Sequence, residues 1–530
     1  MEEFQIILKN FLYNSGVLGF YNILCNAKKE SLVQIQSNTL KVKQQALENF
    51  EEDYFKAMMD TYKEDTKWYN IVNRKERLMQ LELPKDTEEL EYTLRIIKNA
   101  MESASYKSGY EILKEKSEKN PYEILQTIKK SNIEEKRKLL IEIINHIEQN
   151  KEIYCMKDII YTKINCFWSN TAFLYRTANK KDMKQEYKKV FVTPAQNYIK
   201  TDKKNLYQCI ECGNYIKKQE ARGMSWLNDV GVDINKKKSG FWNFTEDMFI
   251  CPICSLIYSC APLGFSMIGS SGIFVNNNES FETMRLDNLK TEIQDLVNQG
   301  SIDSIYHKVI KNYINRLNQI GTYKKVEKEP KNIQVVKRVG EKNRQYYEFN
   351  IISKDKLEIL NRVSNEFDQL VKTNLYGRVL TNLIQGTKQY NLINELLKNK
   401  DTKNVKAILK IESATMKGGI EMKERNECIE EMIKEGENLQ IYFFNRKENR
   451  NKLDAFAFKL QNALKINSVE EFMKLFTLFY GSINEKMPNT EGMKRLIKNP
   501  EEFRLLGYAY VYGLGKIVDK RKEGEDKNEE

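Results

Sequence analysis

The chain has 530 residues, of which 41% are hydrophobic and 30% are charged. This balance is typical of a protein with a sizeable buried core, and it excludes disordered and fibrous chains. Lys and Arg outnumber Asp and Glu by 86 to 74, a net charge of +12 that favours a polyanionic partner. With only two histidines, His146 and His307, the chain cannot build a histidine-rich active site such as that of an HD-type nuclease.

The first 150 residues predict helices with clear start signals. Asp86 and Glu89 have the spacing of a capping box in front of an apolar helical stripe. The Asn-Pro pair at 120–121 places a cap residue before a proline in the first turn, where no amide donor is needed. Ser131, three residues before Glu134, predicts another helix start.

The middle of the chain, from about residue 160 to 350, contains runs that are typical of strands. Residues 190–192 and 273–275 are aromatic and β-branched. Residues 333–339 and 346–352 are also rich in such residues, and the polar segment between them predicts a hairpin.

Residues 248–278 carry no charge. They contain two prolines, three glycines and several serines, which favour a buried core segment over a membrane span. The sequence begins Met-Glu-Glu, so we expect no secretory signal. Nine cysteines without regular spacing then favour reduced thiols and a cytoplasmic location.

From about residue 355 the pattern is helical. Apolar stripes at 453–464 and 469–480 have one-face spacing, and Asn499-Pro500 predicts the start of the last helix. Ser468 caps the second stripe. The predicted fold is therefore α+β and mostly helical, with a mixed N-terminal domain (1–350) and a C-terminal antiparallel helical bundle (355–530).

The strongest motif is a pair of Cys-x-x-Cys knuckles. Cys209 with Cys212, and Cys251 with Cys254, complete the four-thiolate shell that Zn²⁺ favours. The 38 residues between the knuckles indicate an insertion within a zinc module at about 200–265. Redox pairs, unrelated buried cysteines and catalytic zinc are the alternatives, and catalytic zinc would need an open coordination position.

Positive charge concentrates around the knuckles. Residues 176–240 hold 15 Lys and Arg against 7 Asp and Glu, with tyrosines and tryptophans between them. Cations that neutralise phosphates beside rings that stack bases predict nucleic-acid contact, and a solvated lysine surface is the alternative. The candidate cations are Lys188, Lys189, Lys203, Lys204, Lys217, Lys218, Arg222, Lys236, Lys237 and Lys238, with a second patch at Lys337, Arg338, Lys342 and Arg344.

Motifs of common enzymes are missing from the sequence. It contains no P-loop, no dinucleotide fingerprint, and no HExxH, GxSxG or kinase signature. We therefore expect a binding protein and no catalytic residues. The alternatives are a zinc-containing nuclease with unidentified carboxylates and a zinc scaffold of a protein assembly.

Two segments resemble the CXXC–CXXC family of CRISPR-associated proteins, the large subunit of the type I-B Cascade. The run from Cys251 to Phe265 is similar to that family's second knuckle, and Tyr13–Phe20 is similar to its opening N-[AS]-G-x-x-G-[FL] signature. The resemblance implies a non-catalytic role in antiviral defence: binding crRNA and target double-stranded DNA, and recognising the PAM. It implies as partners the backbone, crRNA-end and small Cascade subunits and a recruited helicase-nuclease, with no membrane.

Two further expectations concern particular segments, the second of them from the residues themselves. Asn276, Asn277 and Asn278 are candidates for reading the PAM, because an asparagine amide can pair bidentately with adenine; a turn is the alternative. The segment Lys417–Met422 can be encoded as a purine-rich ribosome-binding sequence before an internal start at Met422. The fragment 422–530 would then be the small subunit, and a loop glycine pair is the alternative.

Overall fold

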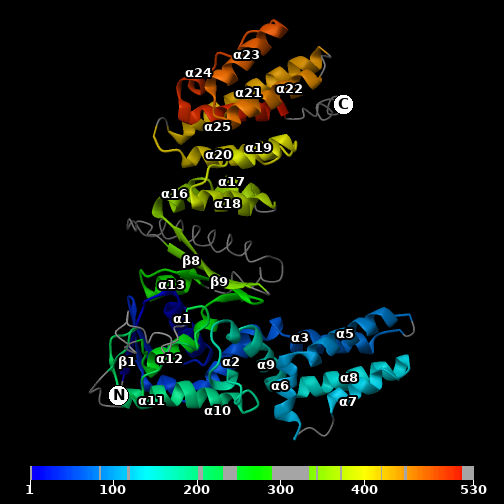
Figure 1. Cartoon of the computed structure of the whole chain (residues 1–530), viewed down its shortest axis with the longest axis vertical. Coiled ribbons are helices and arrows are strands. Elements are labelled where there is room, and N and C mark those ends of the chain that lie inside the picture. Colours follow the sequence, from blue (N-terminus) through cyan, green and yellow to red (C-terminus); the bar gives the residue numbers. More distant parts are fainter. Residues whose placement is uncertain are drawn as a thin grey trace, which may run out of the picture. The chain divides into compact units, whose positions relative to one another are not determined.

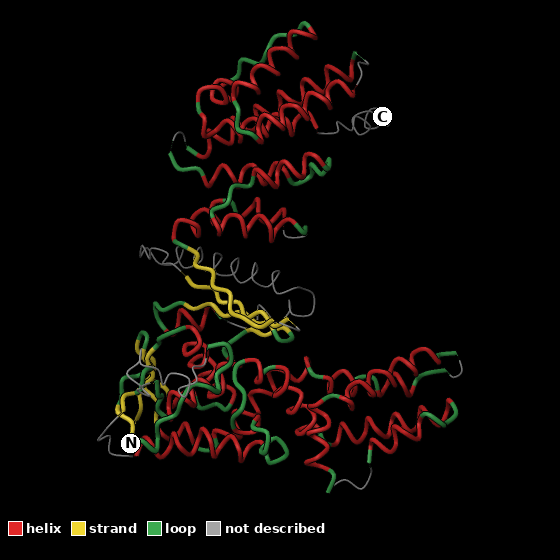
Figure 2. The backbone as a smooth tube through the Cα atoms, in the orientation of Figure 1, coloured by secondary structure: helices red, strands yellow, loops and turns green. Residues whose placement is uncertain are grey.

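The computed structural model describes residues 3–82, 85–115, 120–200, 207–230, 248–288, 333–341, 344–370, 373–418, 421–446 and 450–515. Of these, residues up to 288 together with 333–350 form one compact unit. Residues 351–515 form a second unit. Helices dominate the traces of both units, and the strands lie in small sheets (Figures 1 and 2). The predicted α+β, mostly helical fold class is confirmed.

Two sheets of the first unit frame its core. In one, the antiparallel order is β1-β3-β2, and in the other the order is β6-β7-β8-β9. The predicted hairpin is present as β8 and β9. The strands are β1 (Glu3–Ile7), β2 (Val33–Gln36), β3 (Thr39–Lys43), β6 (Ser266–Ile268), β7 (Ser271–Asn276), β8 (Ile333–Glu341) and β9 (Arg344–Ile352).

Helices make up most of the remainder of this unit. The longer ones are α1 (Phe11–Asn26), α2 (Phe50–Tyr62), α5 (Thr87–Glu102), α6 (Ala104–Leu113), α7 (Pro121–Ile128), α8 (Ile133–Gln149), α9 (Lys151–Thr162), α11 (Thr193–Lys200) and α12 (Pro252–Ser259). The short ones are α3 (Lys67–Val72), α4 (Lys75–Met79), α10 (Met183–Tyr187), α13 (Phe281–Asp287) and the 3₁₀ turn η9 (Ala261–Leu263).

Of three helix starts predicted in this unit, one has the predicted cap and two do not. Asn120 caps α7 as predicted. Helix α5 begins after Asp86, whose carboxylate accepts from the Glu82 amide instead of from the helix. The predicted cap Ser131 is wrong, because Asn132 caps α8 one residue later.

The strand-like run 190–192 is helical, which corrects the prediction from its composition. It lies in a π-helical turn, η6 (Lys188–Val192), between α10 and α11. The ring of Phe191 packs 5.4 Å from Trp168 and 5.3 Å from Trp226, between ring centroids. Burial among these rings overrides the β propensity of the run. The other run, 273–275, lies in β7 as predicted.

Helix α1 packs backbone to backbone on α12 and η9. A Cβ atom at Gly16 would lie 2.3 Å from the carbonyl oxygen of Ile257. At Gly19 it would lie 2.0 Å from the carbonyl oxygen of Cys260. Both separations are far below van der Waals contact, so only glycine permits this approach. The glycines of the N-terminal signature therefore serve to bring α1 against the run that follows the second knuckle.

Apart from Ile351 and Ile352, the last residues of β9, the regular elements of the second unit are all helices among the residues described. Its helices are α16 (Lys354–Arg362), α17 (Ser364–Leu370), α18 (Leu375–Gln385), α19 (Tyr390–Lys398), α20 (Val405–Thr415), α21 (Met422–Asn445), α22 (Arg450–Lys465), α23 (Val469–Ile483), α24 (Glu491–Lys498) and α25 (Pro500–Gly515). Helix α25 is central, since it packs against α19, α20, α21, α22 and α24 (Figure 1). Ser468 caps α23 as predicted. The predicted aromatic stripes are core, with Phe456 and Phe479 stacked 3.8 Å apart.

None of the described helices has the length and apolarity that crossing a membrane requires. The uncharged segment 248–278 instead contains α12, β6 and β7, and most of its side chains are buried.

Candidate metal centre

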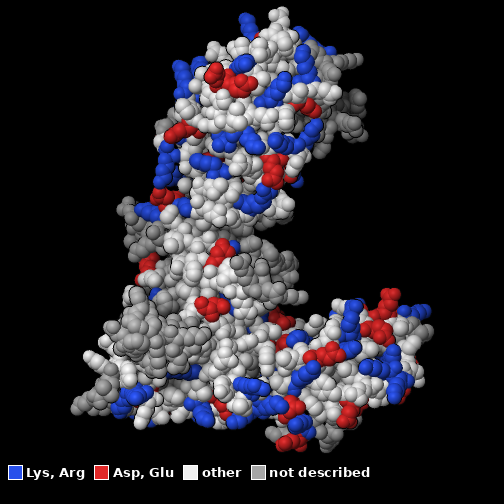
Figure 3. Space-filling model, viewed as in Figure 1, with Lys and Arg blue, Asp and Glu red and all other residues white. Residues whose placement is uncertain are grey.

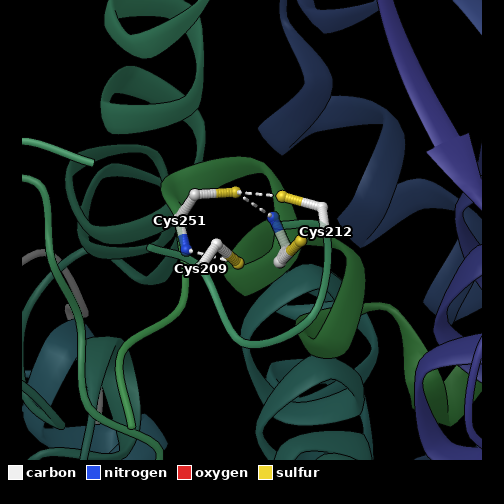
Figure 4. Close-up of side chains that lie close together, drawn as sticks. Cys209, Cys212 and Cys251 are labelled. Atoms are coloured by element: carbon white, nitrogen blue, oxygen red, sulfur yellow. Dashed lines mark hydrogen bonds between the residues drawn. The ribbon is translucent and has the colours of Figure 1, made fainter. Parts of the chain in front are cut away.

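The four knuckle cysteines converge on one point in the first unit. Their sulfur atoms all lie within 4.8 Å of one another. Three of the residues, Cys209, Cys251 and Cys254, are buried, and Cys212 is half-buried. Figure 4 shows the sulfurs of Cys212 and Cys251 pointing toward one another, and they are 3.7 Å apart. No disulfide joins any of the four.

Each knuckle has a local reason for its shape. The first lies in a small hairpin between β4 (Tyr207–Gln208) and β5 (Tyr215–Ile216), where Gly213 has a positive φ of 72°. In the second, Cys251 is the N-cap of α12, and its sulfur accepts from the Cys254 amide at 3.4 Å. The Cys251 amide in turn donates to the Cys209 sulfur at 3.3 Å. Such amide donors stabilise thiolates.

The electrostatics of the four thiols favour a bound cation. Hydrogen bonds from the other three cysteines lower the pKa of Cys209. The hydrogen bonds that Cys251 and Cys254 make to Cys209 and Cys212 raise the pKa of both thiols well above the ordinary value. Four thiolates this close would repel one another strongly, so the protein alone keeps some of them protonated. A divalent metal would allow all four to ionise. Four sulfur donors in two knuckles are the donor set of a closed structural zinc site.

A polar network ties this centre to the first helix. Glu211 lies between two of the cysteines, and its carboxylate accepts from the Tyr258 hydroxyl at 2.6 Å. The Asn10 amide donates to the same carboxylate. The Tyr13 hydroxyl lies 3.5 Å from the Cys254 sulfur. Sequence reasoning missed these residues. Two signals could have indicated them: Glu211 lies inside the first knuckle, and Tyr13 lies beside the N-terminal signature.

Two of the predicted nucleic-acid cations have structural roles. The Arg222 guanidinium lies 4.5 Å from the ring centroids of both Phe191 and Trp226, and burial lowers its pKa to about 10. It also donates to hydroxyl groups of Ser255 and Thr171. The Lys188 ammonium pairs with Glu51 at 2.6 Å.

The remaining cations around the knuckles differ in exposure. Lys189 and Lys218 are exposed, and Lys217 is half-buried. Figure 3 shows Lys and Arg spread over the visible face and interspersed with acidic side chains. Lys203, Lys204, Lys236, Lys237, Lys238 and Lys342 lie outside the described residues, and Arg344 is the first residue of β9.

The predicted basic patch on the hairpin is not formed by Lys337 and Arg338, because both are buried. Arg338 is fully buried, and its guanidinium donates to the carbonyl oxygens of Cys166 and Ser270. Lys337 lies 3.9 Å from Glu348. These two residues stabilise the sheet from within.

Two of the three asparagines proposed for PAM reading, Asn276 and Asn278, bond to a residue of the N-terminal signature. The Asn14 amide donates to Asn276 at 2.8 Å and to Asn278 at 2.7 Å. Asn277 is buried and donates to Asp287 at 2.9 Å. Asn278 alone is exposed. Reading a base would require Asn276 and Asn277 to give up these hydrogen bonds.

Comparison with known proteins gives one match. Residues 202–266, which include all four cysteines, match a family model described as CRISPR-associated protein (Cas_CXXC_CXXC). The chain matches no curated protein and no solved structure. The resemblance expected from the two knuckles is confirmed at the level of this CRISPR-associated family.

Proposed function

We propose that this CRISPR-associated protein is the non-catalytic large subunit of a type I-B crRNA-guided surveillance complex. In this role it binds crRNA and target double-stranded DNA, recognises the PAM and contacts the other subunits. The observation that carries the proposal is the family match over residues 202–266, which coincides with the four-cysteine centre.

We propose that the centre holds one structural Zn²⁺. Cys209, Cys212, Cys251 and Cys254 would hold it, and the bound ion would join the two knuckles into one module. All four donors come from the protein, so the ion has no open position for a water nucleophile. The hydrogen bonds of Glu211 and Tyr13 then fix α1 on this module. A metal that organises a binding surface agrees with a subunit that recognises nucleic acid and leaves cleavage to a recruited helicase-nuclease.

The proposed internal start at Met422 coincides with a structural boundary. Met422 is the first residue of α21, and Gly418 precedes it with a positive φ of 83°. A product beginning there would contain α21 to α25, including α21, α22 and α24, which pack against α25. Arg425 would lose its hydrogen bonds to Ser413 and Gly418 but keep its buried partner Glu502. The helix boundary at Met422 and the retained buried pair support the proposal that the fragment is made separately as a small subunit.

A pull-down through a C-terminal tag tests both parts of this proposal. The expected result is several partner proteins, uniform repeat-derived RNA, and a tagged fragment that begins at Met422. Synonymous recoding of Gly418 and Gly419 should remove the fragment and leave the full chain. A protein without guide RNA or partners would overturn the complex, and a fragment that survives recoding would overturn the internal start.

A further inference from the structure

A groove distant in sequence from the knuckles opens in the first unit between α6, α7, α9 and residues 179–180. Its volume is about 640 Å³, which is within the range of small-ligand sites. In this unit α6 packs on α9 and α7 packs on α8 (Figure 1). None of the residues predicted from sequence to bind metal or nucleic acid lines the groove. It is called the tyrosine groove below.

Three tyrosine rings line it: Tyr110, Tyr122 and Tyr161. The rings of Tyr110 and Tyr122 meet edge to face, 5.1 Å apart at 62°. The Tyr122 hydroxyl donates to the carbonyl oxygen of Met101 at 2.9 Å, which fixes that ring. Rigid aromatic faces at a solvent-accessible site are the usual platform on which unpaired nucleobases stack.

One residue that lines the groove, Asn179, carries a buried acceptor that lacks a donor. The side-chain oxygen of Asn179 is buried without a hydrogen-bond partner. The backbone carbonyl of the same residue accepts from the buried Lys157 ammonium. An unsatisfied buried acceptor is unfavourable, so it favours a ligand that brings a donor. The amino or ring N–H groups of a nucleobase are such donors.

The rim of the groove carries an excess of positive charge. Lys107 is exposed at the groove, and Lys180 lies beside it in an ion pair with Glu111 at 3.0 Å. Glu111 also pairs with Lys114 at 3.2 Å. The residues that line the groove therefore include two ammonium groups, of Lys107 and Lys180, and one carboxylate, of Glu111, which leaves net positive charge for the phosphates that flank a base.

From the rings, the unpaired acceptor and the rim charge we infer that the tyrosine groove binds one unpaired nucleobase of a single-stranded nucleic acid. The inference rests on the proposed function, since it assigns a site to the nucleic acid that the complex carries. A duplex does not fit this role, because its bases are stacked and paired and do not expose a face to a tyrosine ring.

Photo-cross-linking of the purified full chain tests the groove without any substitution. The probe is a single-stranded RNA or DNA oligonucleotide that contains 5-iodouracil. It is irradiated while bound to the purified chain, and the cross-linked residues are identified by mass spectrometry. The expected cross-links are to Tyr110, Tyr122 or Tyr161. Cross-links confined to other parts of the chain would overturn the inference.

Variants then measure the contribution of one ring. Tyr161→Ala should weaken oligonucleotide binding about 5- to 100-fold, the effect of losing one stacked base. Tyr161→Phe should retain the affinity, because stacking needs the ring and not the hydroxyl. Tyr92→Ala, which removes an exposed tyrosine from α5, is the matched control and should leave binding unchanged.

The proposed function and the groove can fail separately. If Tyr161→Ala still co-purifies with guide RNA and partners but binds the oligonucleotide like the wild type, the groove inference fails and the complex stands. The groove would then be assigned to another class of ligand, such as an aromatic side chain of a partner protein. If the wild-type chain carries no guide RNA, the proposed function fails whatever the groove binds.

Discussion

The side-chain amide of Asn10 donates to both carboxylate oxygens of Glu211, at 3.1 and 3.2 Å, across 201 positions of sequence. The same Asn10 caps α1, since its oxygen accepts from the amides of Leu12 and Tyr13. Glu211 lies inside the first knuckle. One asparagine therefore links the start of the first helix to the loop that carries two of the cysteines. A metal that orders this loop would also stabilise the start of α1.

Removing this carboxylate should weaken the centre without touching a ligand. Glu211→Ala leaves the Tyr258 hydroxyl without its acceptor, and the Asn10 amide keeps only its hydrogen bond to that hydroxyl. We expect a cost of about 1–3 kcal/mol in the free energy of unfolding. Loss of a group that bonds directly to a metal ligand typically lowers metal affinity about 10- to 100-fold. The bonds of Glu211 go to Asn10 and Tyr258, so we expect a smaller decrease. Zinc transfer to a chromophoric chelator measures the change. Glu64→Ala, at an exposed acid, is the control, and equal transfer rates for both variants would contradict the role of Glu211.

The cysteine centre itself predicts a fixed metal content. The full chain, purified under reducing conditions, should contain about one zinc per molecule, and Cys209→Ser should lose it. Cys25→Ser is the matched control, because Cys25 is exposed and lies outside the four-cysteine group. Elemental analysis of the three proteins decides the point. A metal-free wild type, or a Cys209→Ser chain that retains zinc, would rule out the site.

The close approach of α1 to η9 predicts that Gly19 tolerates no side chain. Gly19→Ala would place a methyl group 2.0 Å from the Cys260 carbonyl oxygen, so the helix must move. Overpacking of this kind costs about 1–3 kcal/mol, and more where backbone atoms clash. Gly109→Ala, also in a helix of this unit, meets its neighbours at 3.4 Å or more and should change stability by less than about 1 kcal/mol. Urea denaturation of both variants measures the difference, and equal losses would contradict the packing argument.

Local signals predicted many elements because their causes are local. Asn120 and Ser468 cap helices in the structure, since a cap needs only its own turn. The four cysteines were also predictable, because spacing and residue type together specify the ligand set. Residues 190–192 were misread, since their conformation depends on rings contributed by Trp168 and Trp226.

Charge was the least reliable guide to the candidate site. A lysine or arginine in the sequence carries no mark of its burial, and Arg338 and Arg222 resemble surface cations until the surrounding carbonyls and rings are known. The same limit applies to Asn276, Asn277 and Asn278, the candidates for reading the PAM, because the sequence does not show that two of them are buried. The tyrosine groove was invisible in the sequence, because Tyr110, Tyr122 and Tyr161 come from three helices.

A buried ion pair in the second unit should be far more sensitive than an exposed one. Glu502 accepts from Arg425 at 3.3 Å and from Arg495 at 2.7 Å, and the side chains of Glu502 and Arg425 are almost fully buried. Glu502→Gln leaves a buried guanidinium without its carboxylate, which should cost about 3–5 kcal/mol. Glu395→Gln removes the partner of Arg378 in an exposed pair that solvent screens, and it should leave the urea midpoint nearly unchanged. Similar urea midpoints for the two variants would contradict this difference.

The buried Lys157 predicts a specific pH dependence of stability. Burial lowers its pKa from 10.5 to about 8. Below pH 8 the lysine is protonated in both the folded and the unfolded chain, and folding carries the cost of burying a charge. Between pH 8 and 10.5 the unfolded chain binds the extra proton, so the contribution of this residue to stability rises with pH.

Lys157→Met removes that cost and should therefore show its largest advantage over the wild type at pH 7. The advantage should shrink by up to about 3 kcal/mol on going to pH 10.5, since each unit of pKa corresponds to about 1.4 kcal/mol. The lost hydrogen bond to the Asn179 carbonyl shifts both values in the same direction and leaves the sign of the trend between pH 8 and 10.5 unchanged. Urea unfolding of the two proteins at pH 7 and pH 10, with reductant present, gives the two differences. Lys130→Met, at an exposed lysine, should give a difference that is nearly independent of pH, and the same flat result for Lys157→Met would show that its ammonium is not desolvated in the folded chain.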